Sequence, residues 1–189
     1  KYYPLELKNG EIECYIEPFV GGGAVLIDIL QNYKVKEAYA FDINENLINS
    51  YNIIKNNVNE LIHNLKILEK EYLSIEKEAR KEYFYNIRKQ YNSYKLNKDE
   101  KSLQKAVEFI FLNRTCFNGL YRVNKKNEFN VPFGKKTKVN TYEGSNLITV
   151  SNYLTMNNIK ILSIDFEEAV KDVKAKDFIY FDPPYDSDT

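Results

Sequence analysis

The stretch "CYIEPFVGGGAVLIDIL", residues 14–30, decides the fold class of this chain. Its first four residues favour a strand, three glycines follow, and the apolar residues after the glycines recur with helical spacing. A second strand pattern, "EAYAFDIN" at residues 37–44, leads into another helical pattern. This alternation of strand and helix predicts a parallel sheet with crossover helices, and therefore an α/β fold.

The α/β pattern is interrupted and later resumes. The interruption reads as three charged helical segments followed by a β-hairpin around Lys125, Lys126 and Asn127. The pattern then continues with a helix, a strand, a short helix and a last strand, at residues 146–156, at 159–165, from Phe166, and at 177–182. We therefore expect a main domain formed by residues 1–57 and 140–189, with residues 58–139 inserted into it.

Composition limits the class of protein. With 189 residues, 43% of them hydrophobic, the chain can bury a core. Cys14 and Cys116 show no metal-ligand spacing, which predicts a reduced, metal-free protein in the cytoplasm. No run approaches the roughly 20 apolar residues of a membrane span, so we expect no membrane partner, and we expect a monomer. Because residue 1 is Lys rather than Met and the chain stops just after the stretch DPPY at residues 182–185, we also expect a piece of a longer protein, incomplete at both ends.

Charge is distributed unevenly. The whole chain has 27 basic and 27 acidic residues, but residues 80–138 hold 15 Lys and Arg against 5 Asp and Glu. Such a run is often only a solvated helix face. It also fits an insertion that binds a polyanion, attached to an acidic main domain.

The glycine cluster fits a nucleoside site without a pyrophosphate. Gly21, Gly22 and Gly23 do not form a GxGxxG motif, and no Lys-Ser/Thr pair follows as in a phosphate-binding loop. Asp42 ends the next strand, where an acid can bind ribose hydroxyls, and Glu17 could hold an ammonium group or water. S-adenosylmethionine is such a nucleoside. An ordinary glycine turn beside a strand-end acid remains the alternative.

The end of the chain, "IYFDPPYD" at residues 179–186, suits an amino-group substrate. The prolines end the strand, which leaves Asp182 at its tip. The Asp182 carboxylate and the Pro183 carbonyl, held rigid by Pro184, could accept the two hydrogens of a nucleobase amino group. Tyr185 could stack on the base. A simple strand-ending turn is the alternative.

Five stretches together resemble a known family. In order along the chain they are "IEPFVGGGAV", "AFDINENLINSYNIIK", "FIFLNRTCFNGLYRVNKKNEFNVPFG", "ILSIDFEEA" and "YFDPPY". The chain resembles the Dam-type, alpha-group DNA adenine-N6 methyltransferases over nearly its whole length. The resemblance implies a Rossmann-like, S-adenosylmethionine-dependent fold with an inserted, mainly helical and β-hairpin DNA-recognition region. It also implies double-stranded DNA as partner, a flipped adenine and GATC-like sites.

The resemblance assigns roles to three groups of residues. The expected cofactor residues are Glu17, Pro18, Phe19, Gly21, Gly22, Gly23, Asp42, Asp165 and Phe166. The expected catalytic residues are Asp182, Pro183, Pro184 and Tyr185. The expected DNA-binding residues are Arg114, Phe117, Asn118, Leu120, Arg122, Asn124, Lys135, Lys136 and Lys138.

Within the DNA-binding group, Arg122 is expected to contact a guanine edge. Phe117 and Leu120 are expected to wedge between bases, unless they form the core of the hairpin. The three lysines are expected to contact phosphates, while Arg114, Asn118 and Asn124 support the loop or touch phosphates.

Departures from the family pattern keep other functions open. The 189 residues contain neither the lysine-tryptophan-glycine-rich cofactor motif nor the strands that the family pattern places before and after them, so we expect an incomplete sheet and cofactor pocket in this piece. Activity on cytosine-N4, RNA or a protein amide is an alternative, although Asp182 before the prolines favours adenine. A catalytically silent DNA-binding fragment is another. A role in restriction–modification, in a phage or in regulation is equally open.

Overall fold

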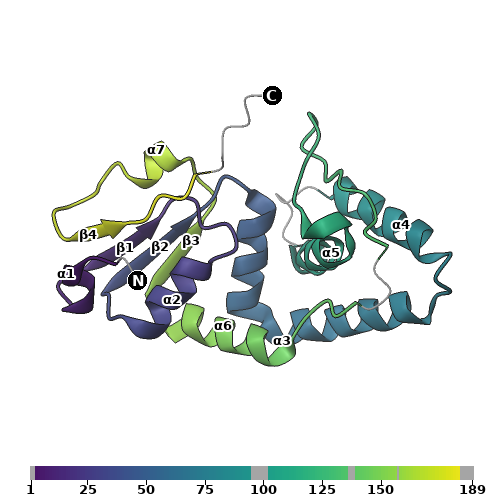
Figure 1. The fold of residues 1–189 in the computed structure, drawn as a ribbon, viewed down its shortest axis with the longest axis horizontal. Coiled ribbons are helices and arrows are strands. Elements are labelled where there is room, and N and C mark those ends of the chain that lie inside the picture. Colours follow the sequence, from purple (N-terminus) through teal and green to yellow (C-terminus); the bar gives the residue numbers. More distant parts are fainter. Residues whose placement is uncertain (1–2, 95–101, 136–138, 157, 184–189) are drawn as a thin grey trace.

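The computed structural model describes residues 3–94, 102–135, 139–156 and 158–183 (Figure 1). Within these residues the strands are β1 (Cys14–Glu17), β2 (Glu37–Phe41), β3 (Ile159–Leu162) and β4 (Asp177–Ile179). The helices are α1 (Leu5–Lys8), α2 (Ala24–Asn32), α3 (Glu45–Ser74), α4 (Arg80–Ser93), α5 (Ser102–Thr115), α6 (Gly144–Met156), α7 (Phe166–Ala169) and the short 3-10 helix η2 (Phe117–Gly119). The predicted α/β class is confirmed.

The strands form a parallel sheet in the order β3-β2-β1-β4. In its register, Ile16 of β1 lies opposite Tyr39 of β2 and Ile179 of β4. The chain thus builds outward from β1 to β3 and then crosses back to the other side of β1. Open α/β sheets bind ligands beyond the carboxyl ends of the strands at such a reversal, which here lies between β1 and β4.

One face of the sheet is covered by helices. Tyr15, Ala38, Ala40, Ile159 and Ile161 are buried on this face, in one cluster with apolar residues of α2, α3 and α6. This burial follows from the sequence, because alternate strand residues point to the same face. The cluster gives the edge of the sheet a rigid base.

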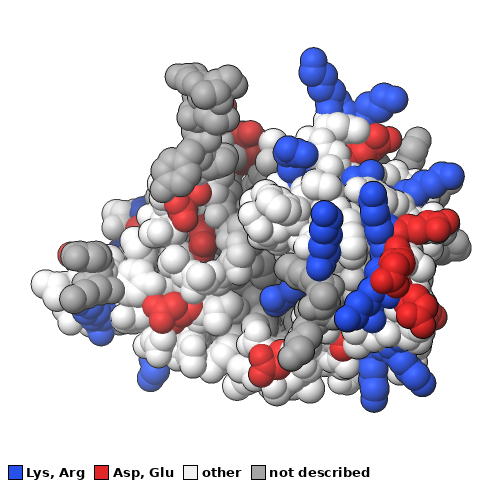
Figure 2. Space-filling model, turned by 45° about the vertical axis from the view of Figure 1, so that its right-hand side comes forward, with Lys and Arg blue, Asp and Glu red and all other residues white. Residues whose placement is uncertain are grey.

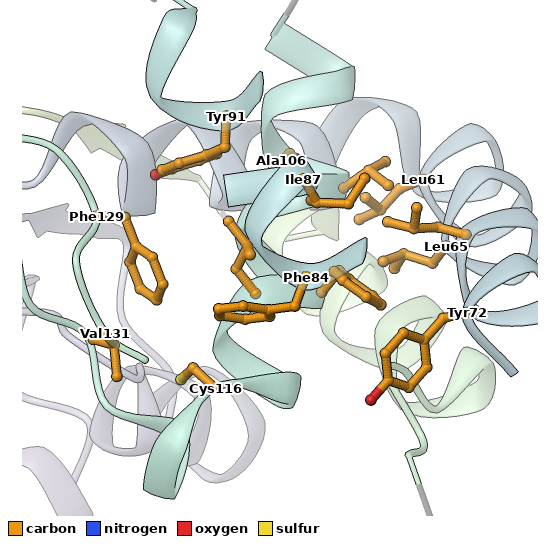
Figure 3. Close-up of a cluster of buried hydrophobic side chains, with 14 of the residues drawn as sticks. Leu61, Leu65, Tyr72, Phe84, Ile87, Tyr91, Ala106, Cys116, Phe129 and Val131 are labelled. Atoms are coloured by element: carbon orange, nitrogen blue, oxygen red, sulfur yellow. The ribbon is translucent and has the colours of Figure 1, made fainter. Parts of the chain in front are cut away.

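The insertion has a hydrophobic cluster of its own. Helix α3 extends from the sheet into the insertion and bends at Asn57, which has φ −138° and ψ 35° (Figure 1). Beyond the bend, Leu61, Leu65, Leu68 and Tyr72 recur at helical spacing and are buried. Figure 3 shows their neighbours from α4, α5 and the hairpin, among them Phe84, Ile87, Tyr91, Ala106, Phe129 and Val131. The predicted boundary between residues 57 and 58 falls at this bend and stays a prediction.

The expected hairpin forms without continuous strands. Antiparallel bridges join Val123 to Phe129 and Cys116 to Phe133. Backbone bonds join the arms beside the first bridge, from the Asn130 N–H to the Arg122 carbonyl at 3.0 Å and from the Asn124 N–H to the Glu128 carbonyl at 2.9 Å. In addition, the Asn92 side chain of α4 donates to the Phe129 carbonyl at 3.1 Å and accepts from the Phe129 N–H at 2.9 Å. Helix α4 therefore holds one arm of the hairpin as a neighbouring strand would.

The last strand is shorter than the sequence predicts. Its ladder ends at Ile179, with one further bond from the Tyr180 N–H to the Ile16 carbonyl at 2.9 Å, so the prediction that it continues to Asp182 is wrong. The reason lies in its neighbour, because β1 ends at Glu17 and Pro18 turns the chain away. Asp182 consequently lies beyond the sheet edge and is exposed.

Candidate active site

Acidic residues follow every described strand at the same edge of the sheet. Glu17 ends β1, Asp42 follows β2, Asp165 lies beyond β3, and Asp182 lies beyond β4. Because the strands are parallel, their carboxyl ends meet at one edge (Figure 1). The structure thus gathers strand-end acids that the sequence analysis assigned separately to a cofactor and to a substrate.

The glycine turn after β1 owes its shape to two of its glycines. Gly21 and Gly23 have backbone φ angles of 46° and 70°, values that residues other than glycine rarely adopt. The Tyr51 hydroxyl lies beneath the turn, where it donates to the Gly21 carbonyl at 3.0 Å and would collide with a Cβ atom on Gly23. Gly22 differs, because a Cβ added there would meet no atom within 4 Å. The turn therefore leaves open space at Gly22.

Asp42 is held in position by backbone groups. Its Oδ2 accepts the Gly21 N–H at 3.1 Å, and its Oδ1 accepts the Asn44 N–H at 2.9 Å. Asn44 in turn caps α3, since its side chain accepts from the N–H groups of Asn46 and Leu47. Each Asp42 oxygen keeps a second lone pair for a ligand hydroxyl.

Glu17 is the buried acid of the site, with 3% of its surface exposed. Burial raises the pKa of its carboxyl to about 7, and the charge of Asp182 adds to the effect. The Tyr15 hydroxyl donates to Glu17 Oε2 at 2.6 Å and opposes the shift. The carboxyl is therefore poised to change charge near neutral pH, and a cation beside it would favour the ionised form.

An aromatic cluster borders the same edge. The Phe19 ring stacks on Phe166 with centroids 5.5 Å apart and tilts against Phe181 at 6.3 Å. Phe166 and Phe181 are 41% and 50% exposed, so a planar ligand can reach both. Asp165 is also exposed and caps α7 by accepting the Glu167 N–H at 2.9 Å.

The other predicted residues of this edge have different positions. Pro18 is buried behind the turn, whereas Pro183 is exposed beside Asp182. Pro184 and Tyr185 lie outside the described residues, as do Lys136 and Lys138.

Within the described ranges, no group of three or more His, Cys, Asp or Glu could hold a metal ion, and no helix is long and apolar enough to cross a membrane.

The loop before the hairpin presents apolar side chains to solvent. Phe117 and Leu120 are 51% and 52% exposed, so neither belongs to the hairpin core. The backbone between them is tightly held: Asn118 adopts φ 54°, and the Asn113 side chain donates to the Gly119 carbonyl at 2.9 Å. The loop is thus a fixed support for two exposed apolar groups.

The polar residues of the hairpin divide into two kinds. Asn124 supports the turn, since its Oδ1 accepts the N–H groups of Lys126 and Glu128 and its amide donates to the Glu128 carboxylate. Arg122 is exposed, and its Nε donates to Asn130 Oδ1 at 2.8 Å. Its two terminal nitrogens remain at the exposed end of the side chain.

Basic side chains cover this part of the molecule. On the face drawn in Figure 2, Lys and Arg side chains gather over the insertion, which the view turns forward. Lys135 and Arg114 are exposed there, and Lys135 adopts φ 55°. Gly134 before it is required by packing, because a Cβ would collide with the Cys116 carbonyl.

Sequence reasoning missed several residues of the site. Tyr15 and Tyr51 contribute hydroxyls, Phe181 contributes a ring, and Asn130 orients Arg122. No pattern in the sequence indicates where the Tyr51 hydroxyl points. The partners of Tyr51, Phe181 and Asn130 lie elsewhere in the chain or across a turn, and only the tertiary fold brings them together. Tyr15 differs, because it lies two residues before Glu17 in β1, where strand alternation already places both side chains on one face.

Comparisons with known proteins agree on one family. The family model described as D12 class N6 adenine-specific DNA methyltransferase matches residues 5–189. The chain is 50% identical over 182 residues to the Type II methyltransferase M.MjaIII of Methanocaldococcus jannaschii, covering 96% of this chain and 62% of the relative. It is 37% identical over 171 residues to the Type II methyltransferase M1.LlaDCHI of Lactococcus lactis subsp. cremoris, covering 90% and 56%. It is 34% identical over 172 residues to a DNA adenine methylase of Haemophilus influenzae, covering 91% and 54%. The chain thus spans less than two thirds of each of these relatives.

Proposed function

The chain belongs to the D12 class of N6 adenine-specific DNA methyltransferases, and we propose that the protein transfers a methyl group from S-adenosylmethionine to an adenine amino group in double-stranded DNA. The main observation behind this proposal is that the proposed catalytic and cofactor residues lie at the same edge of the sheet. There Asp182 follows β4 beside Glu17 of β1, at the reversal of strand order where α/β sheets bind ligands.

The described residues fit the cofactor. S-adenosylmethionine supplies a methyl group activated by a positively charged sulfur. Asp42 is half-buried, has spare acceptor capacity on both oxygens and suits the ribose hydroxyls. Gly22 leaves room for close approach, and the buried Glu17 suits the ammonium group of the methionine end. Phe166 offers an exposed ring for the cofactor adenine, next to Asp165.

Asp182 and Pro183 are proposed to prepare the target nitrogen. The amino group of adenine is a weak nucleophile because its lone pair is delocalised into the ring. The Asp182 carboxylate and the Pro183 carbonyl accept its two hydrogens, which turns the lone pair toward the methyl carbon. The cofactor would supply the methyl group, and its bond to sulfur would break with the electron pair left on sulfur as the new nitrogen–carbon bond formed. The surplus proton leaves along the hydrogen bond to Asp182, whose exposed carboxylate passes it to water. Such alignment can contribute about 7–11 kcal/mol.

Residues 58–139 are proposed as the DNA-recognition region. The exposed Phe117 and Leu120 would enter between base steps and favour a flipped adenine. Arg122, oriented by Asn130, would bind a guanine edge in GATC-like sites. Lys135, Lys136 and Lys138 would bind phosphates without reading sequence.

Product analysis tests the proposal. The full-length gene product, given S-adenosylmethionine with a tritiated methyl group and unmethylated duplex DNA, should yield N6-methyladenine on digestion. Duplexes with single-base changes then define the site. Label found only in N4-methylcytosine, in RNA or in protein would contradict the proposed substrate, and no transfer to any of them would contradict the activity.

A further inference from the structure

We propose that Tyr121 transmits DNA engagement by the hairpin loop to Asp42 in the cofactor site, an inference that rests on the function proposed above. Tyr121 lies between Leu120 and Arg122, two of the proposed DNA contacts. Its hydroxyl donates to Asn44 Oδ1 at 3.3 Å, across 77 positions of the chain. The contact joins the loop to the start of α3 at the sheet edge.

Asn44 carries the connection to the cofactor site. Its Oδ1 caps α3 and its backbone N–H donates to Asp42 Oδ1 at 2.9 Å. Asp42 Oδ2 accepts the Gly21 N–H at 3.1 Å, and Tyr51 holds the other side of that turn. A displacement of Asn44 therefore moves the carboxylate proposed to bind ribose.

The Tyr121 ring packs against residues of the insertion. Its centroid lies 5.5 Å from that of Phe109 in α5 and 5.9 Å from that of Phe129 in the hairpin. The hydroxyl contact is longer than the usual O–H···O distance of about 2.7–2.8 Å. The contact therefore has room to shorten, and DNA that holds Leu120 and Arg122 in place can shorten it.

A contact that tightens when DNA binds must link the two affinities. If DNA strengthens the bond that steadies Asn44, the cofactor binds more tightly in the presence of DNA, and DNA binds more tightly by the same factor in the presence of cofactor. One neutral hydrogen bond corresponds to a factor of about two to ten. Tyr121 thus acts as a positioning residue, without touching either ligand.

The test measures the cofactor Kd of the full-length gene product with and without duplex DNA carrying its site. Tyr121→Phe removes the hydroxyl and keeps the ring contacts. Its cofactor Kd without DNA should stay within about twofold of wild type, while the ratio of the two Kd values should fall by about two- to tenfold. Tyr39→Phe is the matched control, because it loses a hydroxyl bond to Glu37 Oε2 of 2.6 Å on the other face of the sheet. It should keep the wild-type ratio.

A double-mutant cycle identifies the route. Asn44→Ser keeps a capping hydroxyl but is too short to reach Tyr121. Adding Tyr121→Phe to it should reduce the Kd ratio no further. Additive losses, an unchanged ratio in Tyr121→Phe, or a wild-type ratio of one would each overturn this inference alone. Wild-type protein that binds no S-adenosylmethionine would overturn the proposed function as well.

Discussion

The sheet edge and the hairpin loop are built in opposite ways. At the edge, Glu17 is 3% exposed and Asp42 is held by two backbone N–H groups. In the loop, Phe117 and Leu120 are each about half exposed, on a backbone tied down by Asn113. The edge holds polar groups in fixed positions, as transfer chemistry requires. The loop keeps apolar groups in solvent, which is unfavourable until a partner covers them.

This contrast predicts where function and stability separate. Substitutions at the sheet edge should alter the rate of methyl transfer or the stability of the fold, because buried neighbours set the positions of these residues. Substitutions in the hairpin loop should alter sequence preference and base flipping, because folding does not depend on the exposed side chains of the loop. The predictions below run from the largest expected effect to the smallest.

Asp182→Ala should reduce methyl transfer by on the order of a thousandfold, about 4 kcal/mol, because the target nitrogen loses a charged acceptor during the reaction. Since Asp182 is exposed, folding should not change. Single-turnover transfer rates, with cofactor and DNA affinities measured alongside, check this. Near-normal turnover would refute the role of Asp182.

Two phenylalanines of the insertion should differ sharply in stability. Phe84 is fully buried, so Phe84→Ala should lower the free energy of unfolding by about 3–5 kcal/mol. Phe117 is 51% exposed, so Phe117→Ala should change it by only about 0.5 kcal/mol. Urea denaturation measures both.

The same Phe117→Ala variant should slow base flipping, seen as weaker fluorescence of 2-aminopurine at the target position. Unchanged fluorescence would remove Phe117 from the proposed flipping machinery. A stability loss as large as that of Phe84→Ala would show that the loop is part of the core.

Adjacent glycines should separate folding from ligand binding at the sheet edge. Gly23→Ala adds a Cβ against Tyr51 at φ 70° and should cost about 2–4 kcal/mol of stability. Gly22→Ala meets no protein atom, so stability should hold while the cofactor binds less tightly. Denaturation and calorimetry on both variants check this. Equal stability of the two variants would contradict the packing beneath the turn.

Substitutions of basic residues in the insertion should have the smallest effects on activity and binding, and the kind of effect should differ from residue to residue. Arg122→Ala should weaken methylation of the preferred site by about 1–3 kcal/mol and raise relative activity on sites altered at the guanine it reads. Lys135→Gln should weaken binding to all sequences alike and flatten the slope of log affinity against log salt by about one unit. Equal losses on all single-base variants in Arg122→Ala would make Arg122 another phosphate contact.

Local pattern predicted most of the secondary structure. Strand β1 and helix α2 begin where the sequence indicates, because apolar periodicity and the glycine turn are local signals. The predicted end of β4 was wrong, because a ladder ends where its neighbour ends and β1 turns away at Pro18. The hairpin was predicted, but its support by Asn92 was not, since that residue lies 37 positions from Phe129.

The sequence by itself determined the α/β class, the family, and the strand-end acids, since each depends on residues close together in the chain. Only the tertiary structure decided how these groups are held: Tyr51 beneath the glycines, Asn130 on Arg122, and Tyr121 on Asn44. It also decided that Phe117 and Leu120 lie outside the core. The physical reason is that burial and the direction of a side-chain bond depend on partners brought together by packing.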